Sequence, residues 1–383
     1  MADTVVINRR SEPQVLARQP WVDGGMIARR SGAAWPGGAV RLVGERGRFL
    51  AWGVWEGEGR FPIRLVSWEP GAVVGPDLFA DLARASALRR LKLPLRDGTD
   101  AYRVIFAEGD GLPGVIADRY GCCLVVTSTG NALVPYLQSI AQAACEALGL
   151  DGAMLRDDDA SSHLWGSEVP DRLLVREGAL EFAVDLRCGQ KTGWFCDQRE
   201  NRRIVAQYAR GRRTLDVFCY TGGFSVAALA GGAESAALVD SSADALALAD
   251  ENLRLAGVAD RAELLREDGF DALKRLRDEG RRFDLVVLDP PKLIPREADR
   301  GAGSRAYVAL QGLGMSVLKP DGLLVTFSCS GAMDRGSFDR VVAAAAGKRP
   351  CRIVQRLGQP ADHPVSVAFP KGEYLTGLVL QMG

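Results

Sequence analysis

A cysteine and an aspartate each follow an apolar run in the C-terminal half of the chain. Asp289 opens the segment DPPK after the run 283–288, and Cys329 lies in the segment TFSCS after the run 323–327. Two prolines directly after an acid fix an extended turn, so the carboxyl group of Asp289 should be presented rigidly. A thiol and a carboxyl group at the ends of neighbouring strands can act together on a bound molecule.

The chemistry open to this pair is methylation of carbon 5 of a cytosine. Carbon 5 is a poor nucleophile, but addition of the Cys329 thiolate to carbon 6 gives an enamine whose carbon 5 is electron-rich. The positive charge of a methyl sulfonium nearby would favour the thiolate. Asp289, either protonated or bonded to ring N3 and the amino group, would stabilise the negative charge that develops on the ring. The sequence does not identify the base that removes the proton from carbon 5.

A turn rich in glycine, DVFCYTGGF at 216–224, joins a predicted strand to a predicted helix. Paired glycines let the backbone approach a ligand, and Asp240 ends the next strand, where an acid can accept both hydroxyls of a ribose. A nicotinamide cofactor would need the spacing G-x-G-x-x-G, which this turn lacks. S-adenosylmethionine has no phosphate and suits the looser turn. The residues expected to contact it are Asp216, Phe218, Tyr220, Thr221, Gly222, Asp240, Asp268, Asp289 and Pro290.

The elements that must hold these residues alternate between apolar strands and helices from about residue 214 onward. This alternation predicts an α/β fold of parallel βαβ units, in which ligands bind beyond the carboxyl ends of the strands. The expected strands of this doubly wound sheet are seven, at 214–219, 235–239, 262–265, 283–288, 323–327, 351–355 and 374–380.

The first 188 residues show a different pattern. Short β-like runs separated by glycine-rich turns predict a small all-β barrel at the N-terminus. Helical periods among further strand-like runs then predict a mixed α+β middle domain. We therefore expect three domains, at residues 1–72, 73–188 and 189–383.

Composition narrows the class of protein. The formal net charge is zero, which argues against a protein that coats nucleic acid by bulk electrostatics and leaves local RNA binding open. The apolar runs are too short to cross a bilayer, and the N-terminus lacks the apolar core of a secretion signal, so a cytoplasmic protein is expected. Eight cysteines contain no CxxC pair, and no metal site or disulfide framework is expected.

Seven separated segments resemble, in order, the bacterial 23S ribosomal RNA 5-methylcytosine methyltransferases of the large-subunit class I family, which carry an N-terminal PUA domain. The resemblance covers nearly the whole chain. Its segments are QVLARQPWV (14–22), AEGDGLPGVIAD (107–118), GQKTGWFCDQR (189–199), DVFCYTGGF (216–224), DPPK (289–292), TFSCS (326–330) and ADHPV (361–365).

The resemblance implies a PUA barrel that binds RNA, a mixed middle domain and a Rossmann-like methyltransferase that uses S-adenosylmethionine. It implies ribosomal RNA of the large subunit as the partner, Cys329 as the nucleophile and Asp289 as the acid, and it suggests a homodimer. Asp216, Asp240 and Asp268 would serve the methionine amino end, the ribose hydroxyls and the adenine amino group. A loop beside the cofactor would contain Lys191, Thr192, Gly193, Asp197 and Arg199, with Lys191 placed to meet the methionine carboxylate.

Two features depart from related enzymes. The family usually places Phe after DPPK, whereas Leu293 stands here, so stacking of that side chain on the target base is not carried over. Some other RNA 5-methylcytosine enzymes release the product with a second cysteine just before the paired prolines. This chain has Asp289 at that position, so product release must be arranged differently.

Two other functions stay open from the sequence. Methylation of an exocyclic amino group in RNA also uses an acid followed by two prolines, but it usually wants an aromatic residue next, where this chain has Lys292, and it has no use for a thiol. The other is a non-catalytic RNA-binding module built on a methyltransferase fold.

Overall fold

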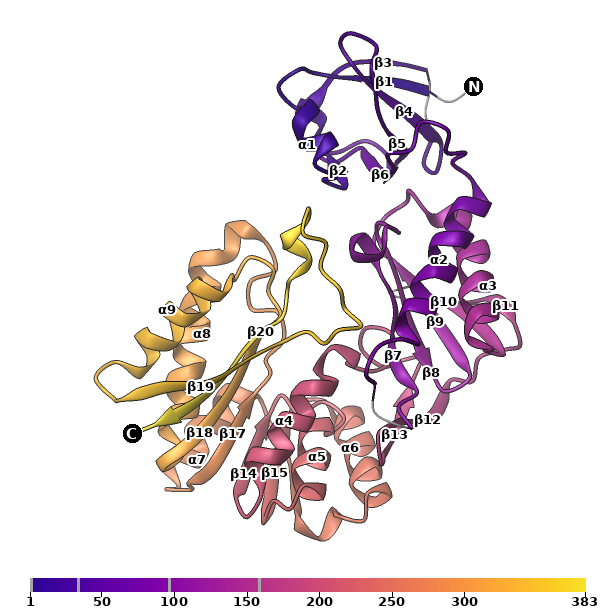
Figure 1. Ribbon diagram of the computed structural model, residues 1–383. Coiled ribbons are helices and arrows are strands. Elements are labelled where there is room, and N and C mark those ends of the chain that lie inside the picture. Colours follow the sequence, from indigo (N-terminus) through magenta and orange to yellow (C-terminus); the bar gives the residue numbers. More distant parts are fainter. Residues whose placement is uncertain (1–2, 33–34, 96–97, 158–159) are drawn as a thin grey trace. The chain divides into compact units, whose positions relative to one another are not determined.

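The chain forms two compact units in the computed structural model, which describes residues 3–32, 35–95, 98–157 and 160–383 (Figure 1). The first unit contains Met1–Val175, Asp185–Cys196 and Ala361–Gly372, and the second contains Arg176–Val184, Asp197–Pro360 and Glu373–Gly383. Both units are therefore built from segments that are distant in sequence. The domain boundaries expected after residues 72 and 188 stay a prediction.

The N-terminal part of the first unit is a six-stranded sheet with the order β2-β6-β5-β4-β1-β3. Its buried side chains include Val5, Val40, Leu50 and Ile63, which come from β1, β4, β5 and β6. The predicted all-β pattern is confirmed for β4, β5 and β6. The elements are β1 (Asp3–Ile7), α1 (Glu12–Leu16), β2 (Trp21–Val22), β3 (Ile27–Ser31), β4 (Ala39–Gly44), β5 (Phe49–Trp55) and β6 (Ile63–Ser67).

The next part of the first unit is a five-stranded sheet of order β11-β10-β9-β8-β7 with two helices packed together on it. Phe79, Ala83 and Ile140 from these helices are fully buried with the sheet residue Leu124. The elements are α2 (Pro76–Arg90), β7 (Ala101–Phe106), β8 (Val115–Tyr120), β9 (Cys123–Ser128), α3 (Leu137–Leu148), β10 (Gly152–Arg156) and β11 (Ser161–Gly166). A separate hairpin follows, of β12 (Arg172–Glu177) and β13 (Leu180–Asp185).

A seven-stranded sheet organises the second unit, and its order is β16-β15-β14-β17-β18-β20-β19. The five strands from β16 to β18 are parallel, as the sequence predicts. The strands are β14 (Arg213–Val217), β15 (Ser235–Asp240), β16 (Ala262–Arg266), β17 (Phe283–Leu288), β18 (Leu318–Ser328), β19 (Cys351–Gly358) and β20 (Thr376–Met382).

Helices cover both faces of this sheet, so the doubly wound α/β fold is confirmed. In Figure 1, α4, α5 and α6 lie on one face, and α7, α8 and α9 lie on the other. Strand β20 pairs antiparallel with both β18 and β19, because no crossover helix separates β19 from β20. The helices are α4 (Arg199–Ala209), α5 (Gly223–Ala230), α6 (Ala243–Leu255), α7 (Gly269–Asp278), α8 (Arg300–Ser316) and α9 (Arg335–Ala346).

Within the described ranges, no helix combines the length and the apolar character needed to cross a bilayer.

A fully buried amide on α6 ties together three segments of the second unit. The Nδ2 group of Asn252 donates to the carbonyl oxygen of Thr221 at 3.0 Å, and its Oδ1 accepts from the backbone N–H of Ala183 at 2.7 Å. Loss of this side chain would leave those backbone groups buried without their partner, and such groups are costly.

We predict that Asn252→Ala lowers the free energy of unfolding by roughly 2 to 4 kcal/mol. Urea unfolding followed by circular dichroism measures the change. Ala247→Ser, at an exposed position of the same helix, serves as the control and should stay within about 0.5 kcal/mol of the wild type. Equal stability of the two variants would contradict the structural role of Asn252.

Candidate active site

Three parallel strands end within two residues of one another at one edge of the seven-stranded sheet. Val217 of β14 pairs with Leu288 of β17, and Leu288 pairs with Thr326 of β18. Asp289 follows β17 directly, and Cys329 follows β18 directly. The Sγ atom of Cys329 lies 4.0 Å from the carbonyl oxygen of Pro290. The structure therefore brings the predicted nucleophile and the segment that carries the predicted acid to the same edge.

The turn after β14 has a strained backbone. Phe218 and Tyr220 have φ angles of 65° and 50°, in the left-handed region that side chains other than glycine rarely adopt. Gly222, with φ 77°, is the N-cap residue of α5, and a Cβ atom there would lie 3.1 Å from the Cβ of Ala249. Two non-glycine residues in this conformation within three positions are typical of a ligand-binding turn.

Asp216 is an acid in an unfavourable, buried environment. Its side chain is almost fully buried, and its Oδ2 accepts a hydrogen bond from the hydroxyl of Ser225 at 2.8 Å. Burial raises the pKa of Asp216 from 3.8 to about 7; the Ser225 bond opposes this rise, whereas the nearby carboxylates of Asp289 and Asp240 add to it. A cationic group bound beside Asp216 would relieve this unfavourable environment.

Asp240 and Asp268 both accept hydrogen bonds from the backbone. Asp240 accepts from the N–H groups of Tyr220 and Ser242, each at 2.9 Å, and so joins the turn after β14 to the turn after β15. Asp268 caps the N-terminus of α7 by accepting from the N–H of Phe270 at 2.9 Å. Both acids thus have structural roles, and their predicted contacts with ribose and adenine stay predictions.

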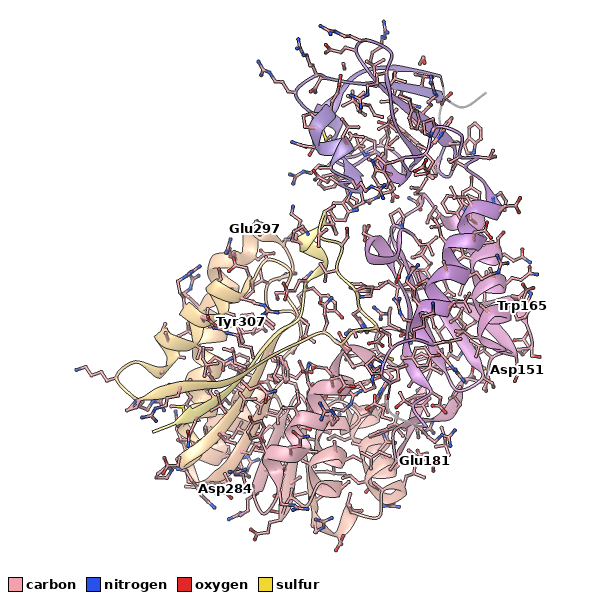
Figure 2. The ribbon with its side chains drawn as sticks, viewed as in Figure 1. Asp151, Trp165, Glu181, Asp284, Glu297 and Tyr307 are labelled. Carbon is pink, nitrogen blue, oxygen red and sulfur yellow. The ribbon has the colours of Figure 1, made fainter. Side chains whose placement is uncertain are left out.

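Buried hydroxyl groups next to Cys329 connect the loop after β18 to the loop after β17. Tyr307 of α8, labelled in Figure 2, accepts a hydrogen bond from Ser328 at 3.0 Å and lies 3.4 Å from the hydroxyl of Ser330. The hydroxyl of Ser330 accepts from the N–H of Ile294, in the segment after DPPK, at 3.3 Å. The residues on either side of Cys329 are therefore fixed to the loop that carries Asp289.

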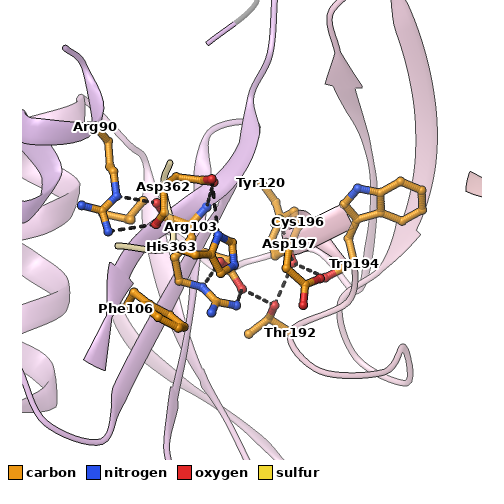
Figure 3. A network of polar contacts seen from close by, with 12 residues as sticks. Arg90, Arg103, Phe106, Tyr120, Thr192, Trp194, Cys196, Asp197, Asp362 and His363 are labelled. Atoms are coloured by element: carbon orange, nitrogen blue, oxygen red, sulfur yellow. Dashed lines mark hydrogen bonds and ion pairs between the residues drawn. The ribbon is translucent and has the colours of Figure 1, made fainter. Parts of the chain in front are cut away.

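The expected loop beside the cofactor is divided between the units. Lys191, Thr192 and Gly193 belong to the first unit, where Thr192 donates to Asp118 at 2.6 Å and contacts the Tyr120 hydroxyl at 2.8 Å (Figure 3). The Nζ of Lys191 lies 4.2 Å from the centre of the Phe195 ring. Their contact with the cofactor stays a prediction.

Asp197 and Arg199 belong to the second unit. The Tyr374 hydroxyl donates to Asp197 at 2.5 Å, and the Nε of Arg199 lies 3.6 Å from the Glu200 carboxylate. Gln198 lies between them, and the sequence alone predicted no role for it. Its amide donates to Asp289 at 2.9 Å. The sequence also left Ser225 and Tyr307 unassigned. The position of Ser225 directly after the GGF turn is a signal that could have identified it.

The turn after β14 fits a ligand that brings a donor and a positive charge. Among the described residues, Asp216 Oδ1 and Thr221 Oγ1 are buried polar atoms without a hydrogen-bond partner. Buried polar atoms in native structures are usually satisfied, so a bound molecule is expected to complete these two. The amino group of S-adenosylmethionine is a donor of this kind, and three nearby carboxylates suit its positive charge.

Comparisons with known proteins show the family to which the chain belongs. The sequence matches the family described as S-adenosylmethionine-dependent methyltransferase over residues 137–367 and a PUA-like domain over residues 5–68. Proteins named ribosomal RNA large subunit methyltransferase I are similar over essentially full length. The protein from Erwinia tasmaniensis is 35% identical over 100% of both chains, and that from Cronobacter sakazakii is 35% identical over 98% of both.

Solved structures share the fold across the whole chain. A SAM-dependent methyltransferase from Streptococcus mutans superposes with a TM-score of 0.87 at 23% identity and covers 100% of both chains. A second structure, of a methyltransferase complexed with SAH, gives a TM-score of 0.88 with the same identity and coverage. At this identity the likeness establishes the fold alone.

The buried carboxyl of Asp216 leads to a prediction about stability. Its pKa in the folded state lies above its value in the unfolded chain, so the folded protein binds the proton more tightly, and the resulting stabilisation is lost as pH rises through about 7. The wild type should lose this stabilisation as the pH rises from 5 to 8, whereas Asp216→Asn has no carboxyl group to ionise. We predict that the free energy of unfolding of Asp216→Asn, minus that of the wild type, increases by about 2 to 3 kcal/mol over this pH range. Urea unfolding without cofactor at both pH values measures this gain.

Asp260→Asn is the matched control, because Asp260 is exposed on the same unit. Its stability relative to wild type should not change between the two pH values. A pH-independent effect of Asp216→Asn would contradict the raised pKa.

Proposed function

Because the chain belongs to the family of S-adenosylmethionine-dependent methyltransferases that includes the ribosomal RNA large subunit methyltransferase I proteins, we propose that it methylates carbon 5 of a cytosine in 23S ribosomal RNA. The observation that carries this proposal is the pair of loops after β17 and β18. They place Asp289 and Cys329 at one edge of the sheet, with the thiol 4.0 Å from the carbonyl oxygen of Pro290.

The residues at the ends of β14 and β15 would hold the cofactor. S-adenosylmethionine supplies, when bound, a methyl group on a positively charged sulfur. Asp216 would accept a hydrogen bond from the methionine amino group, whose positive charge would stabilise the buried carboxylate. Asp240 would accept hydrogen bonds from the ribose hydroxyls. The backbone of the strained turn, including Phe218 and Gly222, would approach the cofactor closely.

Cys329 and Asp289 would act on the base. The Sγ of Cys329 forms a bond to carbon 6, and the electron pair of the 5,6 double bond moves into the ring, where Asp289 stabilises the charge by hydrogen bonding at N3 and the amino group. Carbon 5 then carries the electron density needed to accept a methyl group. In the last step a base takes the proton from carbon 5, the electron pair of that C–H bond forms the 5,6 double bond again, and the C–S bond breaks so that Cys329 leaves as a thiolate.

Three further assignments belong to the same proposal. The PUA-like barrel is proposed to bind ribosomal RNA of the large subunit, as the names of the relatives and the domain match suggest. A homodimer and a cytoplasmic location stay predictions from the sequence.

We predict that the wild-type protein, incubated with S-adenosylmethionine and ribosomal RNA containing 5-fluorocytosine, forms a covalent adduct at Cys329. The fluorine on carbon 5 cannot leave as a proton does, so the thiol stays bonded to carbon 6. Mass spectrometry of the digested complex identifies the modified peptide. Cys329→Ala should form no adduct and should lose at least about 1000-fold in methylation rate, as expected for a missing nucleophile.

Cys351→Ala is the control, because Cys351 is a partly buried cysteine on β19. It should keep both the adduct and the activity. Full activity of Cys329→Ala would reject the covalent mechanism and would favour methylation of an exocyclic amino group, which needs no thiol. Absence of any methyl transfer by the wild type would support a non-catalytic RNA-binding module.

A further inference from the structure

Two buried amide side chains stand one helical turn apart at the start of α4. Gln198 is the residue before Arg199, the first residue of the helix, and Asn201 lies three positions after Gln198, so both face the same side. Each is only 2% exposed. Neither residue carries a charge or a nucleophile, and a sequence pattern alone gives them no role.

The hydrogen bonds of these amides form a chain that ends at Asp289. The Nδ2 group of Asn201 donates to the carbonyl oxygen of Gly358, the last residue of β19, at 3.1 Å, and to Gln198 Oε1 at 2.6 Å. The Nε2 group of Gln198 donates to Oδ2 of Asp289 at 2.9 Å.

The direction of each hydrogen bond in this series is fixed. A backbone carbonyl can only accept, so the Gly358 oxygen requires Asn201 to present its NH₂ group. That NH₂ group requires Gln198 to present its oxygen to Asn201, which leaves the Gln198 NH₂ group facing Asp289. A flip of either amide would set two acceptors against each other in a buried site, which is unfavourable.

We propose that Gln198 and Asn201 are positioning residues that fix the carboxyl group of Asp289 for its action on the target base. The proposal rests on the function proposed above, in which Asp289 contacts the cytosine. A hydrogen bond from a neutral amide supports Asp289 without adding a charge to the site, and it restricts rotation of the carboxyl group. The geometry of the acid toward a flipped-out base is then set before RNA binds.

Gln198→Glu tests the chain because it changes one NH₂ group into an oxygen with almost no change in shape. When the new carboxyl group is ionised, it opposes Asp289 and cannot donate; when it is protonated, its O–H donates as the amide did. We therefore expect kcat at pH 8.5 to fall by about 10- to 100-fold. The ratio of variant to wild-type kcat should rise towards one as the pH is lowered to 6.

The assay is methyl transfer from S-adenosylmethionine to ribosomal RNA by the full chain, with both substrates saturating. The KM for S-adenosylmethionine should change less than about threefold, because the amide acts through Asp289. Gln207→Glu, at an exposed position of α4, is the matched control, and its ratio should stay near one at every pH. A ratio for Gln198→Glu that is near one throughout, or low and independent of pH, would overturn the proposal.

Asn201→Asp provides a second test should Gln198→Glu not fold. Its carboxylate accepts where Asn201 donates, so Gln198 would turn its oxygen to Asp289, and kcat should fall in the same range. Unchanged kcat would overturn the proposal. The wild-type adduct at Cys329 distinguishes failure of this proposal from failure of the proposed function. If the adduct forms and the kcat ratio of Gln198→Glu does not change with pH, only the positioning role of the two amides is rejected. If the wild type forms no adduct, the proposed function itself is rejected.

Discussion

Parallel pairing of β14, β17 and β18 in register is the constraint on which the site depends. The pairs Val217 with Leu288 and Leu288 with Thr326 bring the strand ends to the same edge of the sheet, with β18 two residues longer, so the residues that follow the strands meet there. Their core residues are fully buried against α7, α8 and α9. This apolar burial offsets the unfavourable free energy of placing Asp216 in the interior, since a buried carboxylate without a bound cation destabilises the fold.

Loops carry Asp289 and Cys329, and neutral polar side chains hold these loops in place. The hydroxyl groups of Tyr307, Ser328 and Ser330 connect the residues around Cys329 to the segment after DPPK. The amides of Gln198 and Asn201 connect Asp289 to the end of β19. Neutral donors and acceptors fix the geometry of a thiol and a carboxyl group without adding a charge that would compete with a cationic cofactor.

The sequence predicts the second unit well because its strands are continuous apolar runs whose period differs clearly from that of the helices between them. Asp216 lies within the first of these runs, and Asp240, Asp289 and Cys329 lie at or just after the ends of others; their roles stay predictions. The sequence of strand β3 in the N-terminal sheet, IARRS, contains two arginines and no apolar run, so no strand pattern predicts it. The capping role of Asp268 could have been read from its place before a helical period.

Contacts between residues that are far apart in the sequence could not be predicted. Gln198 lies far along the chain from Asp289, and Asn201 lies far from Gly358, so no local pattern connects them. The separation of Thr192 from Asp197 into different compact units is likewise invisible in a motif that runs through both.

A crystal structure of the protein with S-adenosylmethionine and a short RNA containing 5-fluorocytidine tests the proposed reaction most directly. We predict a bond between Cys329 Sγ and carbon 6 of the base, a hydrogen bond from Asp289 to that base, and the amino group of the cofactor product on Asp216. A base bound away from Cys329, or a cofactor bound away from the turn after β14, would contradict the account.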